Sequence, residues 1–109
     1  MAVNLKKPDN KDLHPIAGII LGTSMANLKN EGTRDLLIIS LPEGATVTGV
    51  FTTNKFCAAP VIIARKNLKL TNKIRALIIN TGSANAGMGD DGLNDSLAIC
   101  EFLASKLNI

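Results

Sequence analysis

The segment Ile74–Gly92, IRALIINTGSANAGMGDDG, decides the fold because it joins an apolar run to a glycine-rich loop. The apolar residues before Asn80 predict a buried strand that ends at turn-forming residues. The residues after the loop, LNDSLAICEFLASKLNI, predict an amphipathic helix over Leu93–Leu107, since apolar side chains recur at three- and four-residue steps. The apolar stripe consists of Leu93, Leu97, Cys100, Ala104 and Leu107.

The apolar segments before this helix predict strands. They are Ile16–Ala26, Asp35–Leu41, Ala45–Asn54, Pro60–Arg65 and Ile74–Ile79. About ten residues or fewer separate successive segments, which leaves no room for a helix and favours antiparallel neighbours. The sequence therefore predicts an α/β (mixed α+β) fold, with a mixed, largely antiparallel sheet and at least one amphipathic packing helix.

Length and composition allow one domain at most, because the chain has 109 residues, of which 46% are hydrophobic. Residues 1–15 are polar, contain Pro8 and Pro15, and predict a flexible lead-in. Residues 16–109 predict a single incomplete domain, because the sequence stops at Leu107-Asn108-Ile109, where no capping or turn residue follows the helix. We therefore expect the N-terminal part of a longer protein.

The sequence predicts neither a secretory signal nor a membrane-spanning segment. The first fifteen residues are too polar for a secretory signal, and the apolar stretches are too short to cross a bilayer. Cys57 and Cys100 show no Cys-x-x-Cys spacing and predict reduced core thiols, with a disulfide between them left open. These features predict a cytoplasmic protein without a membrane partner.

The net charge of +3 and the pI of about 9.1 raise the question of nucleic-acid binding. The basic residues gather in one segment, and they are Arg65, Lys66, Lys69, Lys73 and Arg75. A single-strand binding groove combines such charges with stacking aromatics, and this segment has none. The cluster therefore predicts a solvated connection between two strands, and no nucleic-acid partner.

The loop contains a literal G-x-G-x-x-G at Gly87–Gly92, the pattern of dinucleotide-binding turns. In those turns the first glycine follows the strand directly, whereas here Asn80–Ala86 intervene. Asp90 and Asp91 would also repel a pyrophosphate, and no Gly-Lys-Ser/Thr follows. The hypothesis that this loop binds a phosphate group is therefore rejected. A well-ordered turn and the wall of a small-molecule pocket both remain open.

The sequence contains no complete set of catalytic residues that can be recognised residue by residue. His14, the only histidine, lies in the lead-in, and Cys57 has no histidine near it in sequence. The candidate hydroxyls are Thr46, Thr48, Thr52, Thr53, Thr81 and Ser83, but none has an evident base beside it. Ala45-Thr46 resembles an Ala-Thr self-cleavage site, which we take as chance. No metal-ligand spacing is present in the sequence.

Three blocks, in this order and spacing, resemble the bifunctional ornithine acetyltransferase (glutamate N-acetyltransferase) family. They are TGVFTTN (Thr48–Asn54), AAPV (Ala58–Val61) and INTGSANAGMGDDGLND (Ile79–Asp95), with GTRDLLI (Gly32–Ile38) as a looser match. The resemblance extends over about Ile16–Leu107. The family usually reads Asn-Ser-Gly-Asn-Ala-Asn-Ala-Cys-Thr-Gly, and here Thr81, Ser83, Gly87 and Met88 replace Ser, Asn, Cys and Thr.

The resemblance implies an enzyme of arginine biosynthesis that moves an acetyl group from N-acetylornithine to glutamate without metal or cofactor. Members cut themselves before a threonine, which becomes the N-terminal nucleophile of a second (beta) chain and carries the acetyl group. The implied assembly is a hetero-oligomer, and acetyl-CoA as a further donor is left open. Nucleophile and oxyanion hole are expected beyond Ile109, so this chain has no catalytic residue and no assigned substrate-binding residue.

A second hypothesis is a non-catalytic small-molecule-binding module that uses the Gly/Asn-rich loop 80–92. Such a module would be a compact monomer whose melting temperature rises with its ligand. The fragment hypothesis instead predicts poor solubility, because sheet and helix faces would lack their covers.

Overall fold

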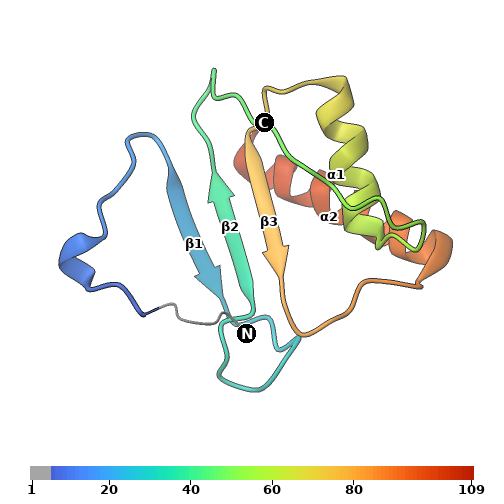
Figure 1. Ribbon diagram of the computed structural model, residues 1–109, viewed down its shortest axis with the longest axis horizontal. Helices are drawn as coiled ribbons and strands as arrows, with labels where there is room; N and C mark the ends of the chain where they lie inside the picture. The colour runs from blue at the N-terminus through green and yellow to red at the C-terminus, as the bar shows by residue number, and fades with distance from the viewer. Residues whose placement is uncertain (1–5) are drawn as a thin grey trace.

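The computed structural model describes residues 6–109. It contains three strands and two α-helices, in the order β1 (Ile20–Ser24), β2 (Leu36–Ser40), α1 (Ala59–Leu70), β3 (Ala76–Asn80) and α2 (Gly89–Leu107) (Figure 1). A short 3-10 turn, η1 (Asn10–Asp12), precedes them. Residues 1–5 of the predicted lead-in lie outside the described residues, and residues 6–15 are exposed.

The three strands form one antiparallel sheet in the order β1-β2-β3. In its register Ile20 pairs with Ser40, and Leu36 pairs with Asn80. The β1–β2 connection is short enough for antiparallel neighbours to form directly. The predicted strands at Ile16–Ala26, Asp35–Leu41 and Ile74–Ile79 are therefore confirmed, as is the antiparallel sheet.

The strand predicted at Pro60–Arg65 is wrong, because these residues lie in α1. Pro60 occupies the first turn of the helix, where its missing N–H is not needed. Ala59 and Ile63, four residues apart, form the buried side of the helix. The expectation that no helix fits before the glycine-rich loop of residues 80–92 (the glycine loop) is also wrong. The basic cluster was predicted to connect two strands, but it begins inside α1.

The strand predicted at Ala45–Asn54 is wrong as well, because this segment forms no ladder with the sheet. Its backbone follows α1 instead. The amide of Val47 donates to the carbonyl of Asn72 at 2.8 Å. Arg65 donates from Nη2 to the carbonyl of Thr52 at 2.7 Å, and its guanidinium lies 5.5 Å from the centre of the Phe51 ring. The segment thus lies beside α1 rather than extending the sheet, and most of its β-branched side chains, such as Val50, are exposed.

The helix predicted at Leu93–Leu107 is confirmed, although α2 begins earlier, at Gly89. Asp90 and Asp91 lie in its first turn and Lys106 in its last, as the helix dipole favours. The predicted absence of a cap is wrong. Asn108 has a left-handed backbone (φ 54°, ψ 48°), and its amide donates to the carbonyl of Ala104, as in helix C-caps.

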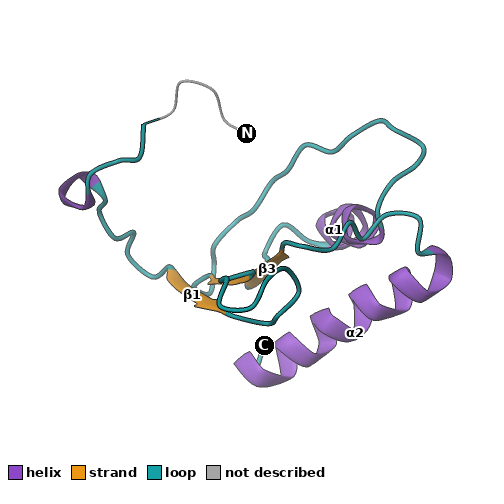
Figure 2. Cartoon of the chain, turned by 90° about the horizontal axis from the view of Figure 1, so that it is seen from below, coloured by secondary structure: helices purple, strands orange, loops and turns teal. Residues whose placement is uncertain are grey.

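The helices lie on one side of the molecule. Figure 2 shows α2 running below the plane of the sheet and α1 beside the β3 edge. α1 packs against α2, and the buried apolar side chains are Ala59 and Ile63. The accessible surface is 8906 Å², whereas a compact monomer of this mass exposes about 5,800 Å². The exposed surface includes large apolar side chains, among them Ile20, Phe56 and Phe102.

Candidate functional site

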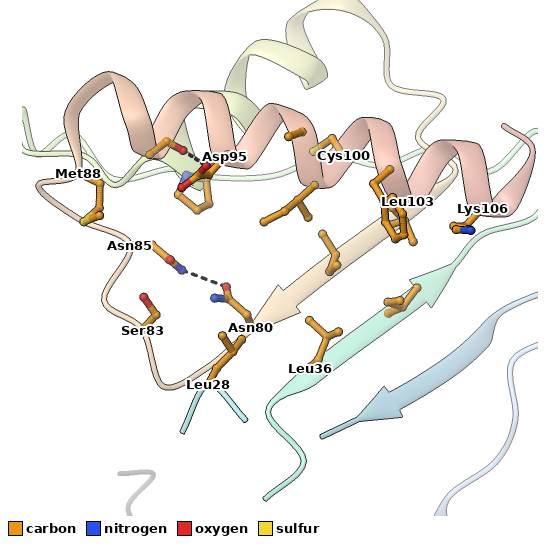
Figure 3. Close-up of a pocket in the computed structure, with 18 residues that line it drawn as sticks. Leu28, Leu36, Asn80, Ser83, Asn85, Met88, Asp95, Cys100, Leu103 and Lys106 are labelled. Atoms are coloured by element: carbon orange, nitrogen blue, oxygen red, sulfur yellow. Dashed lines mark hydrogen bonds between the residues drawn. The ribbon is translucent and has the colours of Figure 1, made fainter. Parts of the chain in front are cut away.

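A groove separates α2 from the face of β2 and β3, with a cavity volume of about 800 Å³ (Figure 3). Its walls are mainly apolar. The sheet contributes Leu36, Ile38 and Ile78, and the helix contributes Ile99, Phe102 and Leu103. These side chains come from alternate positions of the strands and from one face of the helix, as the periods of the two structures require. The groove can therefore accept apolar surface.

The glycine loop closes one end of the groove with polar side chains. Asn80, Ser83 and Asn85 lie there together in Figure 3. Asn85 has a left-handed backbone (φ 53°), a conformation that asparagine tolerates better than most residues. Its Nδ2 donates to Oδ1 of Asn80 at 3.0 Å. This hydrogen bond fixes the loop to the end of β3.

The helix adds two polar groups at the same end, Asp95 and Ser96. The Ser96 hydroxyl donates to the carbonyl of Gly92 at 2.8 Å, so it is already engaged within α2. At the other end, Nζ of Lys106 lies 5.2 Å from the centre of the Phe102 ring, which is within cation–π range. The groove offers amide, carboxylate and ammonium groups, but no nucleophile with a neighbouring base.

The glycines of the G-x-G-x-x-G pattern shape the start of α2. Gly89 has a positive φ of 57°, and Gly92 is buried one turn later. A Cβ at Gly92 would lie 3.5 Å from Cβ of Ala59. A Cβ there would be in ordinary contact with Ala59, but it would lie only 2.6 Å from Cβ of Met88 at the start of the same helix. Gly92 therefore leaves room for the Met88 side chain, and it lies where α1 meets α2.

Asp35 is a functional candidate that the sequence analysis missed. It precedes β2, is 2% exposed, and its carboxylate accepts hydrogen bonds from three backbone amides. The amide of Ala26 is the main cause that lowers the pKa of Asp35, and burial partly opposes it. The sequence analysis included Asp35 in the GTRDLLI match (Gly32–Ile38) but assigned it no role, because an aspartate before an apolar strand is a common pattern.

The other candidates are scattered. His14 is exposed and precedes β1, and the hydroxyls of Thr46–Thr53 belong to the segment beside α1. Of the candidate hydroxyls, Ser83 lines the groove, and Thr81 lies at the start of the same loop. The structure does not bring these groups together into a catalytic set.

Both cysteines are free thiols, and both are half-buried rather than part of the core. Cys100 lines the groove. Burial, and to a smaller extent the charge of Glu101, raise the pKa of the Cys100 thiol. Cys100 is therefore a poor nucleophile at neutral pH.

Residues 6–109 contain no group of three or more His, Cys, Asp or Glu side chains that could hold a metal ion. In the same part of the chain, neither helix has the length and apolar character needed to cross a membrane.

Comparison with known proteins assigns a family. The model of the ArgJ family matches residues 21–109. The chain is 49% identical over 107 residues to the arginine biosynthesis bifunctional protein ArgJ of Neisseria gonorrhoeae, covering 98% of this chain and 26% of that protein. The ArgJ protein of Colwellia psychrerythraea is 42% identical over 119 residues, covering 100% of this chain and 28% of that protein. The chain thus spans about a quarter of these relatives.

Two solved structures share the fold. The ornithine acetyltransferase of Mycobacterium tuberculosis, complexed with ornithine, superposes with a TM-score of 0.79 at 34% identity over 84% of this chain and 48% of that chain. The bifunctional protein of Bacillus halodurans gives a TM-score of 0.80 at 29% identity over 85% of this chain and 48% of that chain. The mixed α/β fold predicted from the sequence is confirmed.

Proposed function

This chain belongs to the ArgJ family, and we propose that it is the N-terminal part of an enzyme that moves an acetyl group from N-acetylornithine to glutamate in arginine biosynthesis. The observation that carries the proposal is the 49% identity over 98% of the chain to a bifunctional ArgJ protein. A similar fold in an ornithine acetyltransferase complexed with ornithine supports the substrate class.

The proposed reaction runs through an acetyl-threonine. The hydroxyl oxygen of an N-terminal threonine attacks the acetyl carbonyl, and ornithine leaves with the proton that the threonine gives up. The amine of glutamate then attacks the acetyl-threonine, so that N-acetylglutamate forms and the hydroxyl is restored. The threonine belongs to a second chain, cut from the same precursor. This agrees with the scattered positions of His14, Cys57 and the hydroxyls of Thr46–Thr53.

The role proposed for residues 16–109 is that of one incomplete domain on which the rest of the protein packs. The groove supports this role, because it exposes side chains such as Phe102 (64%) and Ile99 (49%). Exposed apolar surface on this scale marks an interaction face. We propose that the complete protein is a cytoplasmic hetero-oligomer of two processed chains.

The test begins with intact mass spectrometry of the protein from its natural source. We expect a first chain longer than 109 residues, together with a second chain whose N-terminal residue is threonine. The purified assembly should transfer acetyl groups from N-acetylornithine to glutamate, and replacement of that threonine by alanine should abolish transfer. The matched control is the 109-residue chain alone. Enzyme-like transfer by this chain alone would contradict the proposal.

A non-catalytic binding module is the second candidate, and one observation favours it. Asn80, Ser83 and Asn85 converge at one end of the groove, as polar groups do in ligand pockets. This candidate predicts an 11.5 kDa monomer that melts cooperatively without a partner chain. N-acetylornithine or glutamate at millimolar concentration would then raise its melting temperature. Absence of both the monomer and the shift would eliminate the module.

A further inference from the structure

Asp35 carries the one fully buried polar side chain among the residues that the structure describes. Its charge has no cationic partner there, since the ion pair found in residues 6–109 joins Lys11 to Asp9. Three backbone N–H groups take the place of a cation. Charge-assisted hydrogen bonds of this kind offset the cost of burying a carboxylate.

The three donors belong to one short stretch of the β1–β2 loop. Ala26 donates to Oδ1 at 2.6 Å, while Leu28 and Lys29 donate to Oδ2 at 2.6 and 3.1 Å. Oδ1 therefore binds the start of this stretch, and Oδ2 binds its end. Together they fix the backbone of residues 26–29 relative to the start of β2.

The fixed stretch lies directly against the glycine loop. A Cβ at Gly82 would come within 2.7 Å of the carbonyl oxygen of Leu28 and 2.7 Å of Cβ of Lys29. The backbone of Asp35 also contacts this loop, because its carbonyl accepts a hydrogen bond from the amide of Thr81 at 2.9 Å. Thr81 and Gly82 are consequently held by two parts of the chain: the backbone of Asp35, and residues 26–29, which the Asp35 carboxylate binds.

The residues that Asp35 holds in place adjoin the polar end of the groove. Leu28 lines the groove together with Asn80, Ser83 and Asn85, and these residues lie close to one another in Figure 3. We propose that Asp35 is a positioning residue, which sets the conformation of the glycine loop through residues 26–29 and thereby shapes the polar end of the groove. This inference does not depend on the reaction, because it concerns the shape of the loop.

Hydrogen exchange of the complete assembly tests the proposal. Asn is the matched replacement, because it keeps the size of Asp35 but turns an NH₂ group towards at least one backbone N–H. We expect Asp35→Asn to speed exchange about tenfold in peptides covering 25–34 and 80–88, with the α1 peptide 59–70 unchanged. Faster exchange in 25–34 alone would overturn the proposal, and so would a uniform increase that includes 59–70.

A second variant perturbs the same contact from the opposite side. Gly82→Ala places a methyl group against Leu28 and Lys29, and it should speed exchange in 25–34, about fifty residues away in sequence. Gly44→Ala is the control, because Gly44 has a similar positive φ (84°) but no heavy atom within 4 Å of the added Cβ. Equal effects of the two variants on 25–34 would overturn the proposal.

A spectroscopic signature separates positioning from general stability. The side-chain amide of Asn85 reports on the polar end of the groove, since it donates to Asn80. In selectively ¹⁵N-labelled protein, its two proton signals should shift in Asp35→Asn and in Gly82→Ala. The side-chain amide of Asn94, exposed on α2, should keep its signals in both. An unchanged Asn85 signal in both variants would count against the proposal.

Discussion

Gly92 of α2 faces Ala59 of α1, and a Cβ added to Gly92 would lie 3.5 Å from Cβ of Ala59 and 2.6 Å from Cβ of Met88. A Cβ would still be in ordinary contact with Ala59, whereas the further atoms of a longer side chain would have to enter the contact between the helices. We expect Gly92→Leu to push α1 from α2 and to lower the free energy of unfolding by about 1–3 kcal/mol through overpacking. Urea unfolding followed by circular dichroism measures the change.

Gly22 provides the matched control for this prediction. It lies in exposed β1, and an added Cβ would meet no atom within 4 Å. Gly22→Leu should therefore change the free energy of unfolding by about 0.5 kcal/mol or less. Similar losses for both variants would mean that the α1–α2 contact does not depend on the small residue.

The second prediction concerns the close approach at Gly82, where φ is 98°. Gly82→Ala should lower the free energy of unfolding by about 1–3 kcal/mol, because the backbone strain adds to a contact of 2.7 Å with the carbonyl of Leu28. Gly44→Ala introduces strain without that contact. The difference between their urea midpoints therefore measures the contact, and a larger loss at Gly44 would contradict the assignment.

The sequence predicted those elements whose pattern is local. β2, β3 and α2 each carry their own period of apolar residues, so tertiary structure was not needed to find them. α1 was missed because Val61, Ile62 and Ile63 favour strands by propensity, whereas in the structure these residues form a helix that packs against α2. Asp35 could not be found either. Its burial depends on residues 26–29 folding back onto it, and no sequence period encodes that contact.

The third prediction separates two contributions of Asn85, its left-handed backbone and its hydrogen bond to Asn80. Asn85→Gly keeps the backbone and loses the hydrogen bond, which should cost about 0.5–1.5 kcal/mol. Asn85→Ala loses the bond and also strains the backbone, which should add about 1 kcal/mol. Urea midpoints of both variants test the order, and an alanine variant as stable as the glycine variant would contradict it.

The fourth prediction is a pH dependence that originates at Asp35. Backbone hydrogen bonds, led by that of Ala26, lower the pKa of the folded carboxyl below its ordinary value of 3.8. The stabilisation is therefore present in full above the ordinary pKa and is lost as pH falls through the lower folded pKa. Asp35→Asn should be less stable than the native protein at pH 7, and the difference should shrink towards pH 3.

Urea unfolding at a series of pH values measures this difference. Asp12 in η1 supplies the control, because its side chain is exposed. Asp12→Asn should leave the urea midpoint nearly unchanged at pH 7. A stability difference for Asp35→Asn that stays constant down to pH 3 would show that the charge of Asp35 does not hold the loop.

The fifth prediction tests whether the groove is covered in the complete protein. Cys100 lines the groove, whereas Cys57 does not. Iodoacetamide should modify Cys100 in the isolated chain, with a rate that increases towards alkaline pH, since burial and Glu101 raise the pKa of its thiol. In the assembly the rest of the protein should cover Cys100 and slow its modification at least tenfold. Cys57, free in the same chain, corrects for the general reactivity of thiols. Equal modification of Cys100 in both forms would mean that the groove stays open, which favours a binding pocket over a packing face.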